Sequence, residues 1–521
     1  MDLRRSRSLW ALAGLGLAGS LLTAYAAPRA VADMTVTWWY SPHLPAGRGT
    51  SVVLVYLGMA LLGLAWLGLG TLVTRRPAIR DGRPATRGGR PATRGDLLII
   101  GALWLAPLAL APPLFSRDVY SYLAQGTLLS LGHNPYHDTP AILEQLGHVH
   151  VLSAVSPFWR HTPAPYGPLF LALINLIVTI TGSHLIAGVL LVRAIDLAGL
   201  ALLVAFVPRL TRVLGTCAVR ATWLILSPLV LLELVGAGHN DVLMIGLLAA
   251  GVAVALEGRP LWGIALCGLA ATIKVPALAG AIFIAVAWAR AEDTSQARTR
   301  FLVLSAVIAG ATLATVSAAT GLGISWLTGG VVSTPAKVHL AITPGTGIGW
   351  TVAALAHDAG LGIGVHGAEA AFEGLVAALT AVAGVVLLYR VRIATLVPYL
   401  GAFLIAAAAG GPAAWPWYFT WGLALLAACR GPQRSVAVAL ALALAAFLVK
   451  PNGILALSIH AAPVVLVAYV AIAVAVLRIR RRRGGDRGRN GDRGRNGDRS
   501  VTASGEAGVA DAAALPALTR T

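Results

Sequence analysis

The sequence predicts an all-α, polytopic integral membrane protein, and three observations support this fold class. Hydrophobic residues make up 57% of the 521 positions and charged residues only 12%, whereas soluble globular chains carry about 25% charged residues. The mean hydropathy is +0.77. Apolar runs of about 17–25 residues recur along the whole chain. In lipid these runs are expected to be helices, because every backbone donor and acceptor must pair within its own segment.

Arginines gather in short segments between the apolar runs, which is the positive-inside pattern of membrane proteins. With the N-terminal arginines in the cytoplasm, about 13–15 membrane helices and a large first outer loop, 116–165, are expected. Segments 166–181 and 184–207 must together make one net crossing, so one of them is expected to be re-entrant or peripheral. The expected helices are 9–27, 51–73, 97–115, 166–181, 184–207, 221–235, 242–256, a pair within 261–290, 301–321, 367–389, 393–410, 417–429, 435–449 and 454–477.

Composition divides the chain into three regions. Residues 1–95 hold two helices and the linker RRPAIRDGRPATRGGRPATRG, which is too polar and too broken to pack and is expected in the cytoplasm. Residues 96–480 hold most of the apolar runs and all the candidate site residues, and are predicted to form one membrane-embedded domain. Residues 481–521 contain the repeat GGDRGRNGDRGRNGDRS and are predicted to be a disordered cytoplasmic tail. The N-terminus is similar to a signal peptide, but we interpret it as a retained first helix.

Several functions are disfavoured by the same composition. The net charge of +19 comes almost wholly from arginines between helices and in the tail, so no nucleic-acid partner is expected. The three cysteines are far apart and support neither a disulfide framework nor a zinc motif. The histidines of the first outer loop match no compact ligand spacing, so neither a metal site nor a cofactor is expected.

Asp118 is the strongest candidate catalytic residue. It lies in FSRDVYSYLAQG, where an apolar run ends at the expected outer face. A carboxylate near hydrocarbon costs stability, and partial burial would raise its pKa toward that of a general base. Alternatively, Asp118 is an interfacial helix-end residue that pairs with Arg117.

Further polar residues fall on the same expected face and are predicted to bind substrate. His239 or Asp241 could bind substrate hydroxyls or phosphate, but Asn240 or Asp241 could instead cap the following helix. Lys274 could meet an anionic phosphate or extend its ammonium group to the membrane surface. Arg193 and Asp196, at i and i+3, are expected to neutralise each other. The predicted substrate-binding residues are Arg117, Tyr120, Tyr166, His239, Asn240, Asp241 and Lys274.

Five motifs give the chain a family resemblance. In order, FSRDVYSYLAQG, GHNPY, TPAPYGPLF, GHNDVLMIGL and IKVPAL resemble the actinobacterial polyprenol-phosphomannose-dependent α-1,6-mannosyltransferases of the GT-C class. The resemblance covers roughly 95–450, and the motifs are specific only as a set. It implies a GT-C-like fold in the cell membrane, a polyprenyl-phosphate-mannose donor and an extracytoplasmic active site. It also implies an acceptor that is a mannan or glycolipid of the lipomannan type.

The resemblance also implies a mechanism. GT-C enzymes place an essential acid in the first large outer loop, and Asp118 is the match. Many relatives have a paired acid there, but this chain has Arg117 and Asp118, so only one acid carries over. A β-linked mannosyl phosphate that gives an α product requires inversion, hence one base and no obligatory acid, unlike glycosidases. Alternatives are a prenyl-phosphate-dependent arabinosyl- or glucosyltransferase and a lipid-linked saccharide transporter or flippase.

Overall fold

The computed structural model describes most of the chain up to residue 429. The described residues are 3–30, 36–39, 48–74, 79–80, 83–84, 92–328, 343–411 and 413–429. All of them belong to one compact unit, Met1–Pro463. The expected helices 435–449 and 454–477, the C-terminal tail and most of the arginine-rich linker lie outside the described residues.

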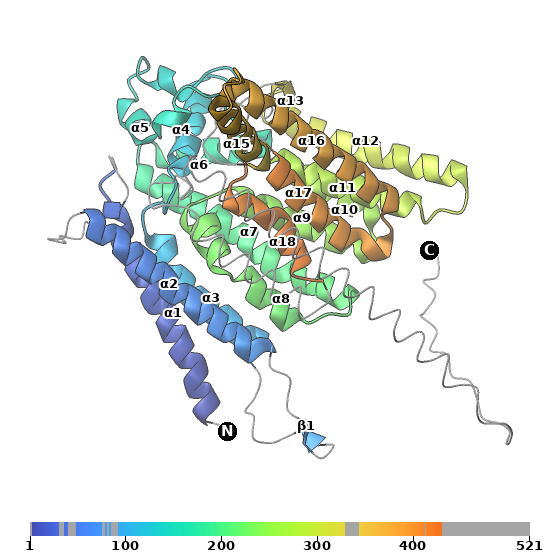
Figure 1. Ribbon diagram of the computed structural model, residues 1–521, viewed down its shortest axis with the longest axis horizontal. Helices are drawn as coiled ribbons and strands as arrows, with labels where there is room; N and C mark the ends of the chain where they lie inside the picture. The colour runs from blue at the N-terminus through green and yellow to red at the C-terminus, as the bar shows by residue number, and fades with distance from the viewer. Residues whose placement is uncertain are drawn as a thin grey trace. The chain divides into compact units, whose positions relative to one another are not determined.

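The fold is all-α, as the sequence predicts (Figure 1). One antiparallel pair of two-residue strands, β1 (Ile79–Arg80) and β2 (Arg83–Pro84), is the exception within the described ranges. The α-helices are α1 (Leu3–Ala30), α2 (Arg48–Thr74), α3 (Arg94–Leu110), α4 (Asp118–Ser130), α5 (Val149–Ala154), α6 (Pro168–Thr181), α7 (Leu185–Val213), α8 (Ala218–Ile225), α9 (Asp241–Leu256), α10 (Pro260–Ala271), α11 (Leu278–Ala289), α12 (Ser295–Ala319), α13 (Ser325–Thr328), α15 (Pro344–Asp358), α16 (Val365–Arg390), α17 (Leu396–Gly410) and α18 (Thr420–Leu426). The tighter 3-10 turns are η1 (Pro140–Leu143), η2 (Pro157–Trp159), η4 (Val275–Ala277), η5 (Ile393–Thr395) and η6 (Pro416–Phe419), and η3 (Leu229–Gly236) is a π-helix.

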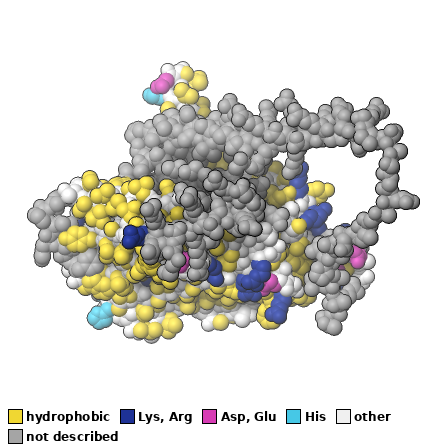
Figure 2. All heavy atoms as spheres, turned by 90° about the horizontal axis from the view of Figure 1, so that it is seen from below, with side chains coloured by type: hydrophobic (Ala, Val, Ile, Leu, Met, Phe, Trp, Pro, Cys, Tyr) yellow, Lys and Arg dark blue, Asp and Glu magenta, His cyan; other side chains and the backbone are white. Residues whose placement is uncertain are grey.

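Six of the described helices are long and apolar enough to cross a membrane: α1, α2, α7, α12, α16 and a span that joins η5 to α17. The pair α8 and η3 would be a seventh span, bent by 51°. Helices α12 and α16 bury little of their surface against the protein. Hydrophobic side chains cover much of the described surface in Figure 2, as expected of helices that face lipid.

The two segments that share one net crossing differ in length. Helix α6 has only 14 residues and α7 has 29, and about 20 apolar residues are needed to cross the hydrocarbon core. By length, α7 is therefore the crossing helix and α6 the partial one.

Two expected boundaries are wrong for local reasons. The helix expected over 97–115 ends at Leu110, before Pro112 and Pro113, because a proline cannot donate its backbone hydrogen bond and disfavours a helical residue before it. The helix expected over 221–235 breaks after Ile225 and resumes as the π-helix η3.

The segment 116–165, which the sequence predicts to be the first outer loop, contains a buried helix. Helix α4 begins at Asp118 and is covered by protein from Val119 to Leu128. It approaches α6 closely at Gly126, where a Cβ atom would come within 2.7 Å of the Ile174 side chain. This helix fixes the position of the candidate base in the fold.

Candidate functional site

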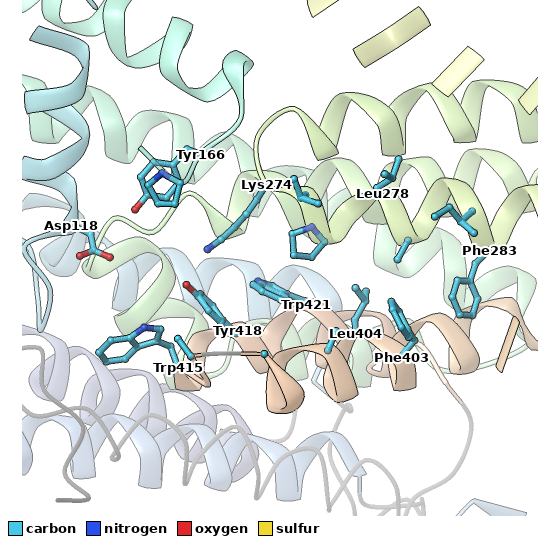
Figure 3. A pocket seen from close by; sticks show the side chains of 18 of the residues that line it. Asp118, Tyr166, Lys274, Leu278, Phe283, Phe403, Leu404, Trp415, Tyr418 and Trp421 are labelled. Carbon is cyan, nitrogen blue, oxygen red and sulfur yellow. The ribbon is translucent and has the colours of Figure 1, made fainter. Parts of the chain in front are cut away.

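A cavity of about 540 Å³ opens between α11 and α17. Figure 3 shows Asp118, Tyr166 and Lys274 toward one end and Phe283 and Phe403 toward the other. The lining between them is apolar and includes Leu278, Ile282 and Leu404. The cavity therefore joins a polar head to an apolar channel, and its volume lies within the usual range for small-molecule sites.

Asp118 forms the polar end of the cavity. It is the first residue of α4 and follows a strained turn, in which Phe115 has φ 59° and is buried. Strain of this kind is often stored at functional sites. The indole Nε1 of Trp159 donates to Asp118 Oδ1 at 2.8 Å, and His239 Nε2 lies 3.6 Å from Oδ2. The carboxylate is thus held from both sides while its side chain stays 16% exposed.

The expected raised pKa of Asp118 is wrong. Burial does raise the pKa of this carboxyl, but the hydrogen bond and charge of His239 and the hydrogen bonds from Ser116 and Trp159 outweigh it, so the pKa lies below its usual range. Asp118 is therefore ionised at neutral pH. The stability that this depressed pKa contributes is present at neutral pH and is lost as the pH falls through the folded-state pKa.

The orientation of His239 follows from the π-helix before it. In η3 the backbone bonds run from residue i+5, for example from Ala237 N to the Leu232 carbonyl, and the Glu233 carbonyl accepts from Nδ1 of His239. A carbonyl only accepts, so Nδ1 carries a hydrogen and Nε2 is the nitrogen that faces Asp118. Rare π-helical turns occur frequently at functional sites.

Lys274 lies on the cavity wall and is held by Asp241. Its Nζ is 2.9 Å from both Asp241 carboxylate oxygens, and Trp421 Nε1 donates to Oδ1 at 2.6 Å. The ammonium also lies 4.3 Å from the centre of the Tyr418 ring, a cation–π contact. Burial lowers the pKa of Lys274, but the charge and hydrogen bond of Asp241 together with the charges of Tyr418 and Asp118 outweigh it, so the pKa lies above its usual value and the residue is a fixed cation.

Tyr166 reaches the cavity because the chain after it packs directly on the turn that carries Lys274. Gly167 N donates to the Ile273 carbonyl at 2.9 Å and Leu169 N to the Thr272 carbonyl at 3.1 Å. A Cβ atom on Gly167 would lie 2.1 Å from the Thr272 carbonyl oxygen. Only glycine permits this approach, so the YGP motif joins two walls of the site.

The structure brings Asp118, Tyr166 and Lys274 together on the cavity, with His239 and Asp241 directly behind them. It does not place the other three predicted residues there. Arg117 donates to carbonyls at the end of α5, Tyr120 is buried within α4, and Asn240 is fully buried with no side-chain cap bond to α9. None of these three residues lines the cavity, and their contact with substrate stays a prediction.

The alternative structural roles also differ from expectation. Asp241 bonds Lys274 rather than capping α9, and Arg193 donates to the carbonyls of Ala109 and Gly236. Arg193 therefore ties the end of α3 to η3, and its role is wider than the expected neutralisation of Asp196.

Four aromatic residues at the site were not predicted to have specific roles. Trp159 and Trp421 donate to the two aspartates, Tyr418 packs on Lys274, and Trp417 stacks on His239. The available signal for Trp159, Trp417 and Tyr418 was the aromatic density of SPFWRHTPAPYGP and GGPAAWPWYF, and Trp421 follows the second stretch. Among the described residues, no group of three or more His, Cys, Asp or Glu side chains could hold one metal ion.

The fold and the site together define a polytopic membrane protein of GT-C-like architecture. The comparisons with known proteins then give its family. The family model described as "Alpha-(1->6)-mannopyranosyltransferase, N-terminal domain" matches residues 11–290. The chain belongs to this alpha-(1->6)-mannopyranosyltransferase family, which confirms the resemblance seen in the sequence.

Two relatives illustrate the similarity. Alpha-(1->6)-mannopyranosyltransferase A of Mycobacterium tuberculosis is 34% identical over 427 residues, which cover 78% of this chain and 77% of the relative. Alpha-(1->6)-mannopyranosyltransferase B of Corynebacterium glutamicum is 29% identical over 451 residues, which cover 79% and 72%. No solved structure matches this chain.

Proposed function

We propose that this protein transfers mannose from a polyprenyl-phosphate-mannose donor to an extracytoplasmic α-1,6-mannan acceptor of the lipomannan type, with inversion. The observation that carries the proposal is the cavity, in which an ionised carboxylate and a fixed cation meet at the head of an apolar channel. A lipid-linked sugar phosphate has the same three parts in the same order: a hydroxyl-bearing sugar, an anionic phosphate and a long hydrocarbon.

The apolar part of the cavity suits the prenyl chain. Leu278 and Phe283 of α11 face Phe403 and Leu404 of α17 across it (Figure 3), and Ile282 also lines it. Burying hydrocarbon there gains roughly 25 cal/mol per Å² of apolar surface. The cavity is too small for a whole polyprenyl chain, so the proximal isoprene units lie in it and the rest extends into the bilayer.

The reaction follows from the polar end. The acceptor hydroxyl attacks the anomeric carbon, its proton passes to an Asp118 carboxylate oxygen, and the bond from the anomeric carbon to the phosphate oxygen breaks. The electron pair leaves with the polyprenyl phosphate, whose growing negative charge Lys274 stabilises as a point charge. A phosphate leaves without prior protonation, so one carboxylate suffices.

Asp118→Asn tests the assignment of the base. Asparagine keeps the side-chain shape, and its carbonyl still accepts from Trp159, but it cannot take a proton. Loss of a general base typically lowers the rate about 10²–10⁴-fold. Wild-type and variant proteins in the same detergent are assayed with mannose-labelled polyprenyl phosphomannose and a short α-1,6-mannoside, next to a donor-binding curve and a thermal melt.

Each outcome has a defined meaning. A slow variant that still binds donor and melts like the wild type supports the base assignment, whereas a near wild-type rate contradicts it. Wild-type transfer from arabinose- or glucose-linked donors but not from the mannose-linked donor overturns the proposed sugar. Movement of intact donor across a proteoliposome bilayer, without transfer to acceptor, would establish a flippase instead.

A further inference from the structure

The side chain of Trp417 does not line the cavity, yet it is built into the site. It is 4% exposed and lies in η6, directly after Trp415 and Pro416. Its ring stacks on His239 with centroids 4.1 Å apart and an interplanar angle of 14°. On its other side, Trp415 stacks at 4.8 Å and 15°. The imidazole is thus the inner layer of a three-ring stack whose outer layer, Trp415, forms part of the cavity wall.

The local sequence explains why the stack is rigid. Pro416 fixes the backbone at the start of η6 and holds Trp415 in extended conformation, with φ −69° and ψ 143°. The Thr420 hydroxyl closes the turn by donating to the Trp417 carbonyl. On the other side, the Glu233 carbonyl holds His239 Nδ1. The imidazole ring is therefore fixed both in its plane and across its face.

The remaining ring nitrogen faces an acceptor. His239 Nε2 and Asp118 Oδ2 lie 3.6 Å apart, and His239 is 1% exposed. A bare nitrogen and an ionised carboxylate would repel each other there, so the pair holds one proton between them. With that proton on His239, the imidazolium lies against the face of Trp417, and an aromatic face attracts a cation within about 6 Å.

We propose that Trp417 is a positioning residue that acts through His239: it orients the imidazole toward Asp118, so that the positively charged ring balances the charge of Asp118 when the anionic donor binds. The inference rests on the proposed function, since it needs an anionic donor. With His239 protonated, its charge and that of Lys274 balance those of Asp118 and Asp241. Without it, the donor phosphate meets one uncompensated negative charge.

Several other titratable groups surround His239 and must be separated from it experimentally. These are Asp118 on α4, Asp196 on α7, the Glu233 carboxyl on η3, Asp241 on α9, and Lys274 between α10 and α11. Asp196 Oδ2 lies 3.7 Å from the position that a Cβ atom on Gly238 would take. His239→Gln removes the proposed group alone, and Glu233→Gln removes the adjacent carboxyl while keeping the backbone carbonyl.

The test is a double-mutant cycle on the apparent KM for polyprenyl phosphomannose, measured at one pH. Trp417→Leu removes the aromatic face but keeps an apolar side chain, so this KM should rise roughly 2- to 30-fold. In a His239→Gln background the same change should have no further effect, because Trp417 acts through the imidazole. Trp417→Phe keeps a ring and should restore most of the wild-type KM, and Glu233→Gln should leave the effect of Trp417→Leu in place.

A matched control is the second buried tryptophan stack, Trp66 on Trp223, with centroids 4.8 Å apart and no part in the cavity lining. Trp223→Leu should lower the melting temperature without changing the apparent donor KM. If Trp417→Leu only lowers the melting temperature and keeps the wild-type KM, or if it raises the KM equally in the His239→Gln background, the positioning role is refuted. If the wild type transfers no mannose from the donor, the proposed function fails instead.

Discussion

Lys274→Met should separate a structural effect from a functional one. Lys274 Nζ lies 2.9 Å from both oxygens of Asp241, whose side chain is 1% exposed. Removing one partner of a buried ion pair typically costs about 3–5 kcal/mol, because the other charge remains buried without compensation. Lys274→Met alone should therefore lower the melting temperature strongly, whether or not Lys274 contacts the donor.

The double variant Lys274→Met/Asp241→Asn removes this penalty. Both charges are gone, and Trp421 Nε1 can still donate to the asparagine carbonyl in place of Oδ1. Its melting temperature should recover most of the loss. Its donor affinity should not recover, because a hydrogen bond to a charged group is worth about 1.5–3 kcal/mol, or roughly a 10- to 100-fold rise in the donor Kd.

The measurements are a thermal melt and a donor-binding titration on all four members of the cycle. Arg209→Met is the matched control, because Arg209 pairs with Glu257 at an exposed site where the loss should be about 0–1 kcal/mol. If the double variant binds the donor as tightly as the wild type, Lys274 does not act on the phosphate. The lysine would then only stabilise the fold through Asp241.

Two further predictions concern topology and packing. A cysteine placed at Ser153 should react with an impermeant maleimide from outside the cell, whereas the exposed native Cys217 should react only after permeabilisation; the reverse pattern would put the site on the cytoplasmic face. Gly167→Ala should lower the free energy of unfolding by about 1–3 kcal/mol through overpacking against the Thr272 carbonyl. The control is Gly310→Ala in α12, where no atom lies within 4 Å of the new Cβ, and this change should be neutral or stabilising. Equal melting temperatures for the two variants would refute the close-approach argument.

Hydrophobic runs predicted the long helices because a membrane span needs length and apolarity, both of which are visible in one dimension. They could not predict α4. This helix has only 13 residues and buries Ser121, Gln125 and Thr127 as well as its apolar side chains. It is stabilised by the protein around it rather than by lipid, so its sequence carries no membrane signal. The sequence therefore predicts no helix within 116–165, where the structure has α4.

The sequence predicted that the site residues lie on one side of the membrane, but it did not predict which side chains pair with each other. Arginine clusters placed Asp118, His239, Asp241 and Lys274 on one side, and the structure brings all four together. The pairing of Lys274 with Asp241 depends on how α9 packs beside α10 and α11, which the sequence pattern does not encode. The sequence analysis also did not account for the direction of the Tyr120 side chain. Successive helical residues turn by about 100°, so a residue two positions after Asp118 points almost to the opposite face of the helix.

The lowered pKa of Asp118 changes what the proposed base can contribute. A general base is most effective when its pKa is close to the working pH, and the hydrogen bonds from His239, Ser116 and Trp159 hold Asp118 below the usual range for its type. It is therefore always ionised but a weak base. It can take the acceptor proton only late, when the hydroxyl oxygen is already bonding to the anomeric carbon and has become acidic. In the proposed mechanism more of the rate must then come from departure of the phosphate next to Lys274, so the loss in Asp118→Asn should fall near the lower end, about 10²-fold.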